Sequence, residues 1–427
     1  MNVLLTRDPE KPVQQMGPEH RPGSIAESGV RASVLEDLAL KTLYLSGPFS
    51  VVELGKLMHL GYEVAFELFD KMRGKLLCEV TGMFGHVANL AITSMGRTRA
   101  MELLAQSQYA GAAPVSLHSY VEQVRKQSIR NVRVTREEIQ RGFANFVLDE
   151  KTLSQFGTAL NSGEAIFLYG PPGTGKTSAA ETLASVLAQD SVWIPHAVEV
   201  DGQIIVVYDP TLHKPLPPAQ EPHDKRWIRC SRPTVIVGGE LTMEMLDLQF
   251  SSATNYYVGP AQMKANNGTL IIDDFGRQRI TPEELLNRWV VPLDRGIEFL
   301  TLAGGRKIEV PFELLVVFAS NKDPLKLLDP AFLRRIQTKI RIGAVTPAQF
   351  CEIFRRVAKQ HGATADDQTI YDLIAVIRDE LKEDLRACHP RDLINQVAWA
   401  ARYEDKRLQL DRASLIKAVE SYFLARP

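Results

Sequence analysis

The sequence predicts an α/β core built on a parallel β-sheet, with an all-helical region after it and a small winged-helix-like domain before it. Three observations lead to this expectation. Short, uninterrupted apolar segments such as 165–169 and 314–320 are typical of parallel strands that are buried on both faces. After Thr346 the apolar residues recur only at helical spacing. Before residue 107, the pattern of three amphipathic helices gives way to two short strands.

The composition is that of a globular protein with more than one domain. The chain has 427 residues, of which 45% are hydrophobic and 24% charged, and at about 100–200 residues per domain we expect two to four domains. The 50 basic and 51 acidic side chains give a net charge of -1, which excludes a globally basic, nucleic-acid-binding surface. No apolar run approaches the roughly 18–20 residues of a membrane span. Four cysteines without a CxxC pair favour a reducing compartment, so we expect a cytoplasmic protein with no membrane segment.

Three segments precede the predicted α/β core, which begins at residue 146. Residues 1–30 are rich in proline, glycine and charge, and we expect them to form a flexible arm. Residues 31–107 show helical periodicity, then two short strands around a glycine-containing turn, then a further helix, which is the winged-helix pattern. Residues 108–145 are expected to form a connector, and its basic residues are interpreted as a solvated face.

The third predicted helix of the winged-helix-like domain, residues 62–73, bears on the choice of partner. Such domains often bind DNA through this helix. Here the helix carries Glu63, Glu67 and Asp70, and carboxylates repel the phosphates of DNA. We therefore favour docking to protein over binding to DNA, which stays open as the second interpretation.

A glycine-rich loop is the most specific motif of the chain. The sequence GPPGTGKT lies between a predicted strand at 165–169 and an Ala/Leu-rich helix at 178–189, so it matches GxxxxGK[ST] in its required context. The backbone N–H groups of such a loop converge on phosphate oxygens, and the helix N-terminus adds a partial positive charge. The residues expected to bind nucleotide are Gly170, Pro171, Pro172, Gly173, Thr174, Gly175, Lys176, Thr177 and Ser178.

Two carboxylates complete the predicted site. Asp273 and Asp274 follow an apolar strand at 268–272, and ligands of open α/β sheets bind beyond the carboxyl ends of the strands. We expect Lys176 to reach the β- and γ-phosphates of ATP, and Thr177 and Asp273 to hold Mg²⁺. Asp274 would orient or deprotonate the attacking water.

These motifs resemble those of the AAA+ ATPases, and further matches follow in the same order. Asn321, at the end of the predicted strand 314–320, resembles sensor 1 of that superfamily. The segment DPAFLRRI at 329–336 resembles the one that carries the arginine finger. Arg391, in the segment HPRDL, resembles sensor 2. The resemblance covers roughly residues 143–402.

The resemblance implies an ATPase that works as a ring. Asn321 would help to place the attacking water, and Arg391 would reach the γ-phosphate. Arg334 or Arg335 would act as the finger on a neighbouring subunit's nucleotide, and the sequence leaves open which one. A finger supplied in trans requires a closed homo-oligomer, which in this superfamily is most often a hexamer.

One position departs from the family pattern. The strand usually ends Asp-Glu, whereas this chain has Asp273-Asp274. The shorter side chain places its carboxylate about 1.5 Å further back, and misplacing a catalytic group by about 1 Å can cost roughly 10²-fold in rate. We therefore expect either slow hydrolysis or a water that is held by a shifted backbone.

An ANNGTL segment at 265–270 and one predicted hairpin resemble the branch that includes MoxR-like chaperones, magnesium-chelatase motor subunits and bacterial enhancer-binding activators. Strands at 298–302 and 307–310 flank a tight turn where that branch carries its pre-sensor-1 hairpin, with an ordinary edge hairpin as the alternative. Residues 198–208 predict a second hairpin that turns at Asp201-Gly202, inside an insertion of the kind that docks partners.

The segment YYVG at 256–259 permits two interpretations. An aromatic–aliphatic–glycine sequence resembles the pore loop with which unfoldases grip polypeptide. Paired tyrosines are more often half-buried packing residues, and this alternative is favoured.

The predicted function is that of a cytoplasmic AAA+ ATPase, with its core over 146–345 and a helical lid over 346–427. It would couple binding and hydrolysis of Mg·ATP to remodelling of an unidentified protein partner, in the manner of a MoxR-like chaperone. Two alternatives are kept. One is a DNA-handling ATPase, such as a loader or transcription activator. The other is a nucleotide-switched scaffold with weak hydrolysis.

Overall fold

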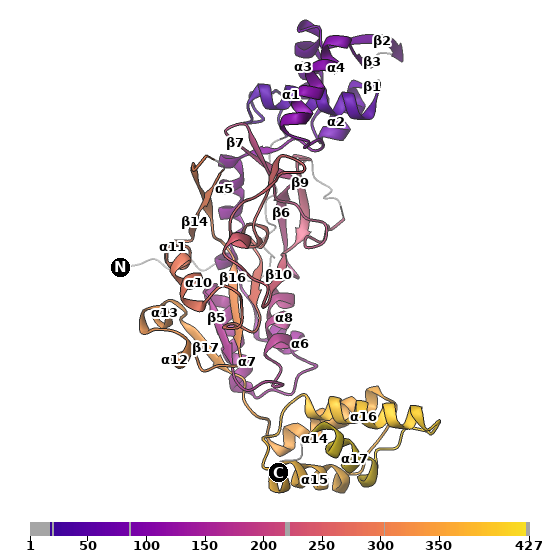
Figure 1. The fold of residues 1–427 in the computed structure, drawn as a ribbon, viewed down its shortest axis with the longest axis vertical. Helices are drawn as coiled ribbons and strands as arrows, with labels where there is room; N and C mark the ends of the chain where they lie inside the picture. The colour runs from indigo at the N-terminus through magenta and orange to yellow at the C-terminus, as the bar shows by residue number, and fades with distance from the viewer. Residues whose placement is uncertain (1–17, 19–20, 85–86, 218–222, 303, 424–427) are drawn as a thin grey trace.

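The chain is elongated in the computed structural model, which describes residues 18, 21–84, 87–217, 223–302 and 304–423. A small N-terminal module lies at one end, a helical C-terminal unit lies at the other, and two five-stranded β-sheets with two shorter antiparallel pairs occupy the middle (Figure 1). Within those residues, no helix combines the length and the apolar character that crossing a membrane requires.

A five-stranded parallel sheet forms the α/β core, as predicted. The strands lie in the spatial order β10 (Thr234–Val237), β13 (Thr269–Ile272), β16 (Leu315–Ser320), β5 (Ile166–Tyr169) and β17 (Thr338–Arg341). Because β16 lies between β5 and β13, the residue that follows β16 comes between the loop after β5 and the carboxylates after β13. This order brings three predicted site segments to one edge of the sheet.

Helices cover both faces of this sheet (Figure 1). Successive side chains of a strand point to opposite faces, so Phe167 and Phe318 pack on one face while Leu168 and Val317 pack on the other. The first face is covered by α10 (Pro282–Arg288), α11 (Val290–Arg295) and α13 (Pro330–Arg335), with α12 (Pro324–Leu327) leading into α13. The second face is covered by α6 (Arg136–Gly142), α7 (Glu150–Ser162) and α8 (Lys176–Leu187). Apolar residues on both faces explain the uninterrupted apolar runs.

A second sheet combines two strands from the insertion between α8 and β10, two from the segment between β10 and β13, and one from the connector. Its order is β11 (Gln249–Ser251), β12 (Tyr256–Val258), β8 (Gln203–Val206), β7 (Ala197–Val200) and β4 (Val115–Ser116). The antiparallel pair β7–β8 confirms the hairpin predicted around Asp201. The second predicted hairpin is β14 (Ile297–Thr301) paired with β15 (Lys307–Pro311). A further antiparallel pair joins β6 (Ser191–Pro195) to β9 (Trp227–Ser231).

The pore-loop interpretation of residues 256–259 is wrong. Tyr257 is only 3% exposed and lies in β12, which pairs with both β11 and β8. The ring of Tyr256 packs edge-on against Tyr109, with 5.7 Å between ring centroids. Both tyrosines are therefore packing residues of the second sheet, which is the favoured alternative.

The N-terminal module contains four helices and three short antiparallel strands in the order β1-β3-β2. Along the chain these are α1 (Ala32–Ser46), β1 (Phe49–Ser50), α2 (Val51–Met58), α3 (Tyr62–Gly74), β2 (Cys78–Phe84), β3 (Val87–Ile92) and α4 (Ser94–Gln106). Most of the predicted arm, residues 1–17 and 19–20, lies outside the described residues. Residues 21–30 differ from the expected flexible arm, because Ile25 and Val30 are buried in the module's core.

The predicted connector packs against the body of the protein. Its helix α5 (Leu117–Lys126) packs Tyr120 and Val124 into the core under the second sheet, and a short 3-10 turn (Ile129–Asn131) leads to α6. The basic side chains of the connector are exposed, as interpreted, and Arg130 also lies 3.4 Å from Glu164.

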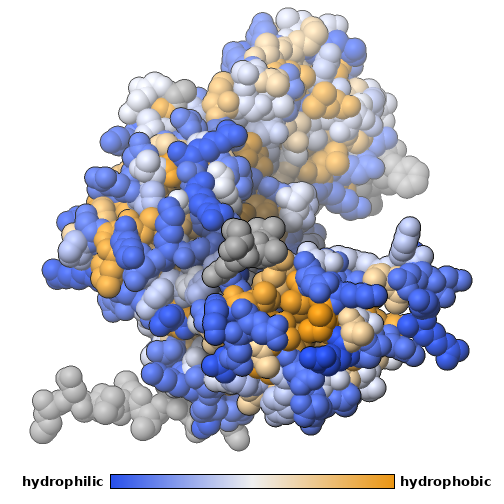
Figure 2. Space-filling view, turned by 60° about the horizontal axis from the view of Figure 1, so that its bottom comes forward, coloured by the Kyte–Doolittle hydropathy of each residue, from blue (hydrophilic) through white to orange (hydrophobic). Residues whose placement is uncertain are grey.

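Helices alone make up the C-terminal unit, as predicted. They are α14 (Pro347–Gln360), α15 (Asp367–Ala375) with a following π-turn (Val376–Glu380), α16 (His389–Tyr403) and α17 (Arg412–Tyr422). Their apolar stripes meet in one core. In the view of Figure 2 the surface of this unit is mostly hydrophilic, with one apolar patch.

Acid is expected to destabilise this helical unit through His389. The ring is 1% exposed, packs edge-on against Tyr422 and Phe423, and leaves Nε2 without a partner in the described part of the chain. Burial, with Arg386 nearby, lowers the pKa of His389 from 6.5 to about 4. The unfolded chain therefore takes up a proton first, so stability is full above pH 6.5 and falls as the pH drops towards 4.

Urea unfolding of the full chain at pH 7 and at pH 5 measures this dependence. The expected result is a lower midpoint at pH 5, with a smaller pH difference in His389→Gln. The matched control is His361→Gln, which changes an exposed histidine of the same unit. An equal pH difference in both variants would contradict the assignment.

Candidate nucleotide-binding site

A cavity of about 940 Å³ lies where the core meets the C-terminal helical unit. One end is polar, with Lys176, Thr177 and the two aspartates that follow β13. The other end is apolar and includes side chains of α14 and of the loop between α6 and α7. Most of the residues predicted for the nucleotide site line this single cavity. They are Pro172, Gly173, Thr174, Gly175, Lys176, Thr177, Ser178, Asp273, Asp274, Asn321 and Arg391.

The loop after β5 depends on its glycines. Gly173 and Gly175 have φ angles of +77° and +93°, a region that side chains with a Cβ rarely adopt. A Cβ on Gly173 would also lie 2.5 Å from the Cys388 sulfur. Gly175 is the N-cap of α8, so the positive end of that helix faces the cavity. Gly170 and Pro171 are not among the residues that line the cavity.

Lys176 brings a buried positive charge to the polar end. The residue is 7% exposed, and its Nζ donates to the Pro171 carbonyl at 2.7 Å. Burial lowers the pKa of Lys176, while the negative charges of Asp274 and Asp273 act in the opposite direction. A cation held with one carbonyl partner is poised to receive an anionic ligand.

Thr177 and Asp273, which both line the cavity, are joined by a hydrogen bond although they are 96 residues apart in the chain. The Thr177 hydroxyl lies 3.0 Å from both carboxylate oxygens of Asp273. Mg²⁺ prefers hard oxygen ligands and is usually held by one or two carboxylates together with substrate phosphates. A hydroxyl and a carboxylate beside the glycine-rich loop have the oxygen ligands that this ion prefers.

Asp274 and Asn321 form a second polar pair at the same edge. The Asn321 amide Nδ2 donates to Asp274 Oδ1 at 2.9 Å. Asp274 has a φ of +49°, in the left-handed region that aspartate tolerates better than most side chains. Its N–H donates to Asp273 Oδ1 at 2.9 Å, which fixes this turn. The backbone at Asp274 is therefore held in the left-handed region by this turn.

The C-terminal unit contacts the glycine-rich loop after β5 directly. The Cys388 N–H donates to the Gly173 carbonyl at 3.0 Å. Arg391, one turn further along α16, lines the cavity with an exposed side chain that pairs with Asp392 at 2.9 Å. The predicted lid arginine thus lies at the rim of the cavity.

Arg334 and Arg335 lie away from the cavity, near the C-terminal end of α13. Arg335 pairs with Asp294 of α11 at 3.1 Å, and its guanidinium lies 5.9 Å from the centre of the Phe332 ring. Arg334 is exposed. Neither arginine reaches the site of its own chain.

Sequence reasoning missed the apolar end of the cavity. The loop at 145–149 contributes Phe146, Val147 and Leu148, and α14 contributes Ile353 and Val357. The sequence signal for this part of the site was the apolar triplet that directly precedes Asp149. Asp149 is the N-cap of α7, and its carboxylate accepts a hydrogen bond from the Thr152 N–H at 2.8 Å.

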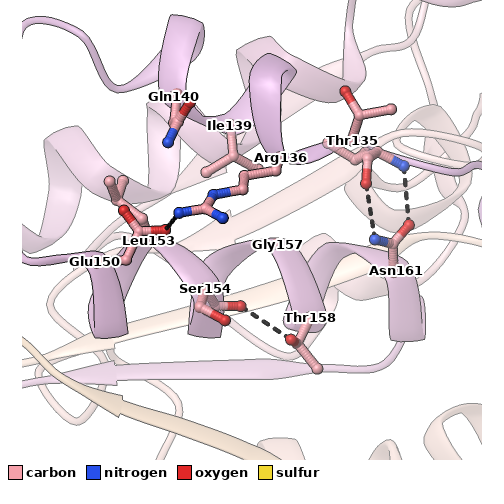
Figure 3. A pocket seen from close by; sticks show the side chains of 11 residues that line it. Thr135, Arg136, Ile139, Gln140, Glu150, Leu153, Ser154, Gly157, Thr158 and Asn161 are labelled. Carbon is pink, nitrogen blue, oxygen red and sulfur yellow. Dashed lines mark hydrogen bonds and ion pairs between the residues drawn. The ribbon is translucent and has the colours of Figure 1, made fainter.

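A smaller cavity of about 270 Å³ lies between α6 and α7 and contains none of the predicted site residues (Figure 3). Several of its polar groups are paired within the chain. Arg136 pairs with Glu150 at 2.6 Å, and the Asn161 side chain binds both the N–H and the C=O of Val134 at 2.9 Å. The larger cavity is therefore the candidate site.

Comparison with known proteins adds one family match. Residues 346–421, within the helical unit, match a family described as a domain of unknown function (DUF8689). No curated protein matches the chain.

Solved structures resemble the chain only distantly. NtrX from Brucella abortus in complex with ATP is 14% identical, with a TM-score of 0.41, and the match covers 66% of this chain and 58% of that chain. A RuvB mutant from Thermotoga maritima is 15% identical, with a TM-score of 0.37, and the match covers 69% and 72%. The chain thus spans less than two thirds of the length of NtrX. Likenesses of this size establish neither a shared fold nor a shared activity.

Proposed function

We propose that this chain is an AAA+-type ATPase that binds Mg·ATP in the large cavity and hydrolyses it. One observation carries the proposal. Buried Lys176, the Thr177 hydroxyl and the Asp273 carboxylate converge at the polar end of one cavity, with Thr177 and Asp273 in hydrogen-bond contact. A loop that cradles phosphate, a cation and two hard oxygen ligands are what a metal-bound triphosphate requires.

The shape of the cavity supports a whole nucleotide as ligand. Ligand cavities usually measure about 300–1,000 Å³, and this one is polar at the loop and apolar at Leu148, Ile353 and Val357. The triphosphate would lie along the loop after β5, and the base would lie between α14 and the loop at 145–149.

The roles of the residues follow from their positions. Thr177 and Asp273 would hold Mg²⁺, which when bound neutralises charge on the phosphates. Lys176 would bind the terminal phosphate oxygens. Asp274 would orient the attacking water or accept its proton, and Asn321 would hold the Asp274 carboxylate in place by its hydrogen bond of 2.9 Å.

Arg334 is the better candidate for the arginine finger that acts on a neighbouring subunit's nucleotide. Arg335 is already paired with Asp294 of its own chain, whereas Arg334 is exposed on the same helix. Because neither reaches the site of its own chain, a finger from this helix would have to act on a neighbouring subunit's nucleotide. The proposed assembly is therefore a closed ring.

Arg334→Ala is expected to lower the rate of ATP hydrolysis by about 10³-fold and to leave ATP affinity nearly unchanged. Arg335→Ala is the matched control and should retain most of the activity. Phosphate release measures both. Mixing Arg334→Ala subunits with Lys176→Ala subunits should restore some activity, because each supplies what the other lacks. The assignment of Arg334 would be wrong if the mixed subunits did not regain ATP hydrolysis and Arg335→Ala lost it completely.

The proposed role of hydrolysis is to remodel a protein partner, in the manner of MoxR-like chaperones. The β14–β15 hairpin directly precedes β16, at whose end Asn321 lies, so it would move with the nucleotide site. The N-terminal module, proposed to be winged-helix-like, exposes Tyr62 and Phe66 on α3 beside Glu63. Exposed aromatic and acidic side chains suit a protein partner better than DNA.

Capture with a variant held in the ATP-bound state tests the choice of partner. Asp274→Asn should bind ATP without hydrolysing it, and a protein should co-purify with it. If only nucleic acid co-purified, and its affinity for the protein fell steeply with salt concentration, the DNA-handling alternative would be favoured instead.

A further inference from the structure

Two adjacent arginines of α14 make contacts of different kinds. Arg355 pairs with Asp367 inside the helical unit, at 2.7 Å. Arg356 reaches across to the core, where its Nη1 donates to the Ala144 carbonyl at 2.8 Å and to the Phe146 carbonyl at 3.5 Å. Its Nε donates to Glu352 at 2.7 Å, which holds the guanidinium in this direction.

The loop at 144–149, whose carbonyls accept from Arg356, leads into the apolar end of the cavity. Phe146 is followed by Val147 and Leu148, which line that end. The loop is fixed by the Phe146 N–H, which donates to the Phe143 carbonyl at 2.8 Å, and by the Asp149 cap of α7. Between these points, the backbone groups of Val147 and Leu148 form no hydrogen bond with any described part of the chain. They are free to bind polar atoms of a ligand.

We propose that Arg356 is a positioning residue that sets the base selectivity of the nucleotide site, an inference that rests on the proposed function. By holding the carbonyls of Ala144 and Phe146, it fixes the backbone N–H and C=O groups of Val147 and Leu148 opposite the base. Adenine presents an amino donor where guanine presents a carbonyl acceptor. A fixed pair of backbone groups that satisfies adenine leaves guanine with unpaired polar atoms, which is costly in a buried site.

Three ligands separate this role from a general effect on folding. Mg·ATP uses both ends of the cavity, Mg·GTP differs only at the base, and inorganic tripolyphosphate with Mg²⁺ uses only the polar end. Dissociation constants for each are measured by calorimetry on the full chain. The variants are Arg356→Ala, Arg356→Lys and the matched control Arg355→Ala, which removes the neighbouring arginine without touching the loop.

The wild type should prefer ATP to GTP. Arg356→Ala should weaken ATP binding by about tenfold, the equivalent of about 1.4 kcal/mol, and should reduce the ATP/GTP ratio by a similar factor. Its affinity for tripolyphosphate should be unchanged. Arg355→Ala should match the wild type for all three ligands, and Arg356→Lys should retain part of the selectivity through its single ammonium donor.

Several results would overturn the inference. One is an ATP/GTP ratio of Arg356→Ala equal to that of Arg355→Ala. Another is a parallel loss of ATP and tripolyphosphate affinity, which would indicate damage to the whole cavity. A wild type that binds tripolyphosphate but does not distinguish the bases would defeat the selectivity claim alone. A wild type that binds neither ATP nor tripolyphosphate would defeat the proposed function itself.

Discussion

Replacing Lys176 by alanine is expected to weaken Mg·ATP binding by about 100-fold or more. The ammonium group is buried beside the phosphate-binding loop, and its contact with the Pro171 carbonyl is available for exchange with phosphate oxygens. Removing one partner of a buried charge pair costs about 2–5 kcal/mol of binding free energy. Isothermal titration with Mg·ATP measures the effect.

The control for this variant is Lys151→Ala, which removes an exposed lysine from α7. It should bind ATP like the wild type. Without nucleotide, Lys176→Ala should unfold at a temperature close to that of the wild type, because relief from burying the ammonium opposes the loss of its attraction to Asp273 and Asp274. Unchanged ATP affinity in Lys176→Ala would contradict the assignment of the loop.

Replacing Asp274 by asparagine is expected to lower the hydrolysis rate by about 10²–10³-fold with little change in ATP affinity. A general base contributes about 10²–10⁴-fold to a rate, and Asp274 directly follows Asp273, the proposed metal ligand, and accepts a hydrogen bond from Asn321. Steady-state phosphate release and calorimetry separate the two effects. Equal losses of affinity and rate would show that Asp274 serves binding instead.

Replacing Asp274 by glutamate distinguishes a tuned catalyst from a weakly hydrolysing scaffold. The backbone of Asp274 has a φ of +49°, which glutamate adopts less readily. The longer side chain would also displace its carboxylate from Asn321. We therefore expect slower phosphate release than in the wild type. A large gain in turnover would support the scaffold interpretation.

Local sequence signals were sufficient for the core and for the polar end of the site. A strand, a glycine-rich loop and a helix are consecutive in the chain, so Lys176 and Thr177 could be placed from that segment alone. Asp273 could be placed because carboxyl ends of parallel strands share one edge. The all-helical C-terminal unit followed from its apolar periodicity.

Features that depend on distant contacts could not be predicted in this way. Residues 256–259 carry a pattern that fits either a loop or a strand, and pairing with β8 decides between them. The apolar end of the cavity combines a loop before α7 with a helix about 200 residues further along, at Ile353. Proline and glycine near residue 25 suggested an arm, whereas burial of Ile25 overrides that local preference.

A crystal structure with a non-hydrolysable ATP analogue and Mn²⁺, located by its anomalous signal, shows directly whether these residues hold a metal-bound triphosphate. We expect one metal peak between the Thr177 hydroxyl and the Asp273 carboxylate, with Lys176 Nζ on the terminal phosphates. A triphosphate bound away from the loop after β5, or a metal that contacts neither Thr177 nor Asp273, would show that the proposed site is wrong.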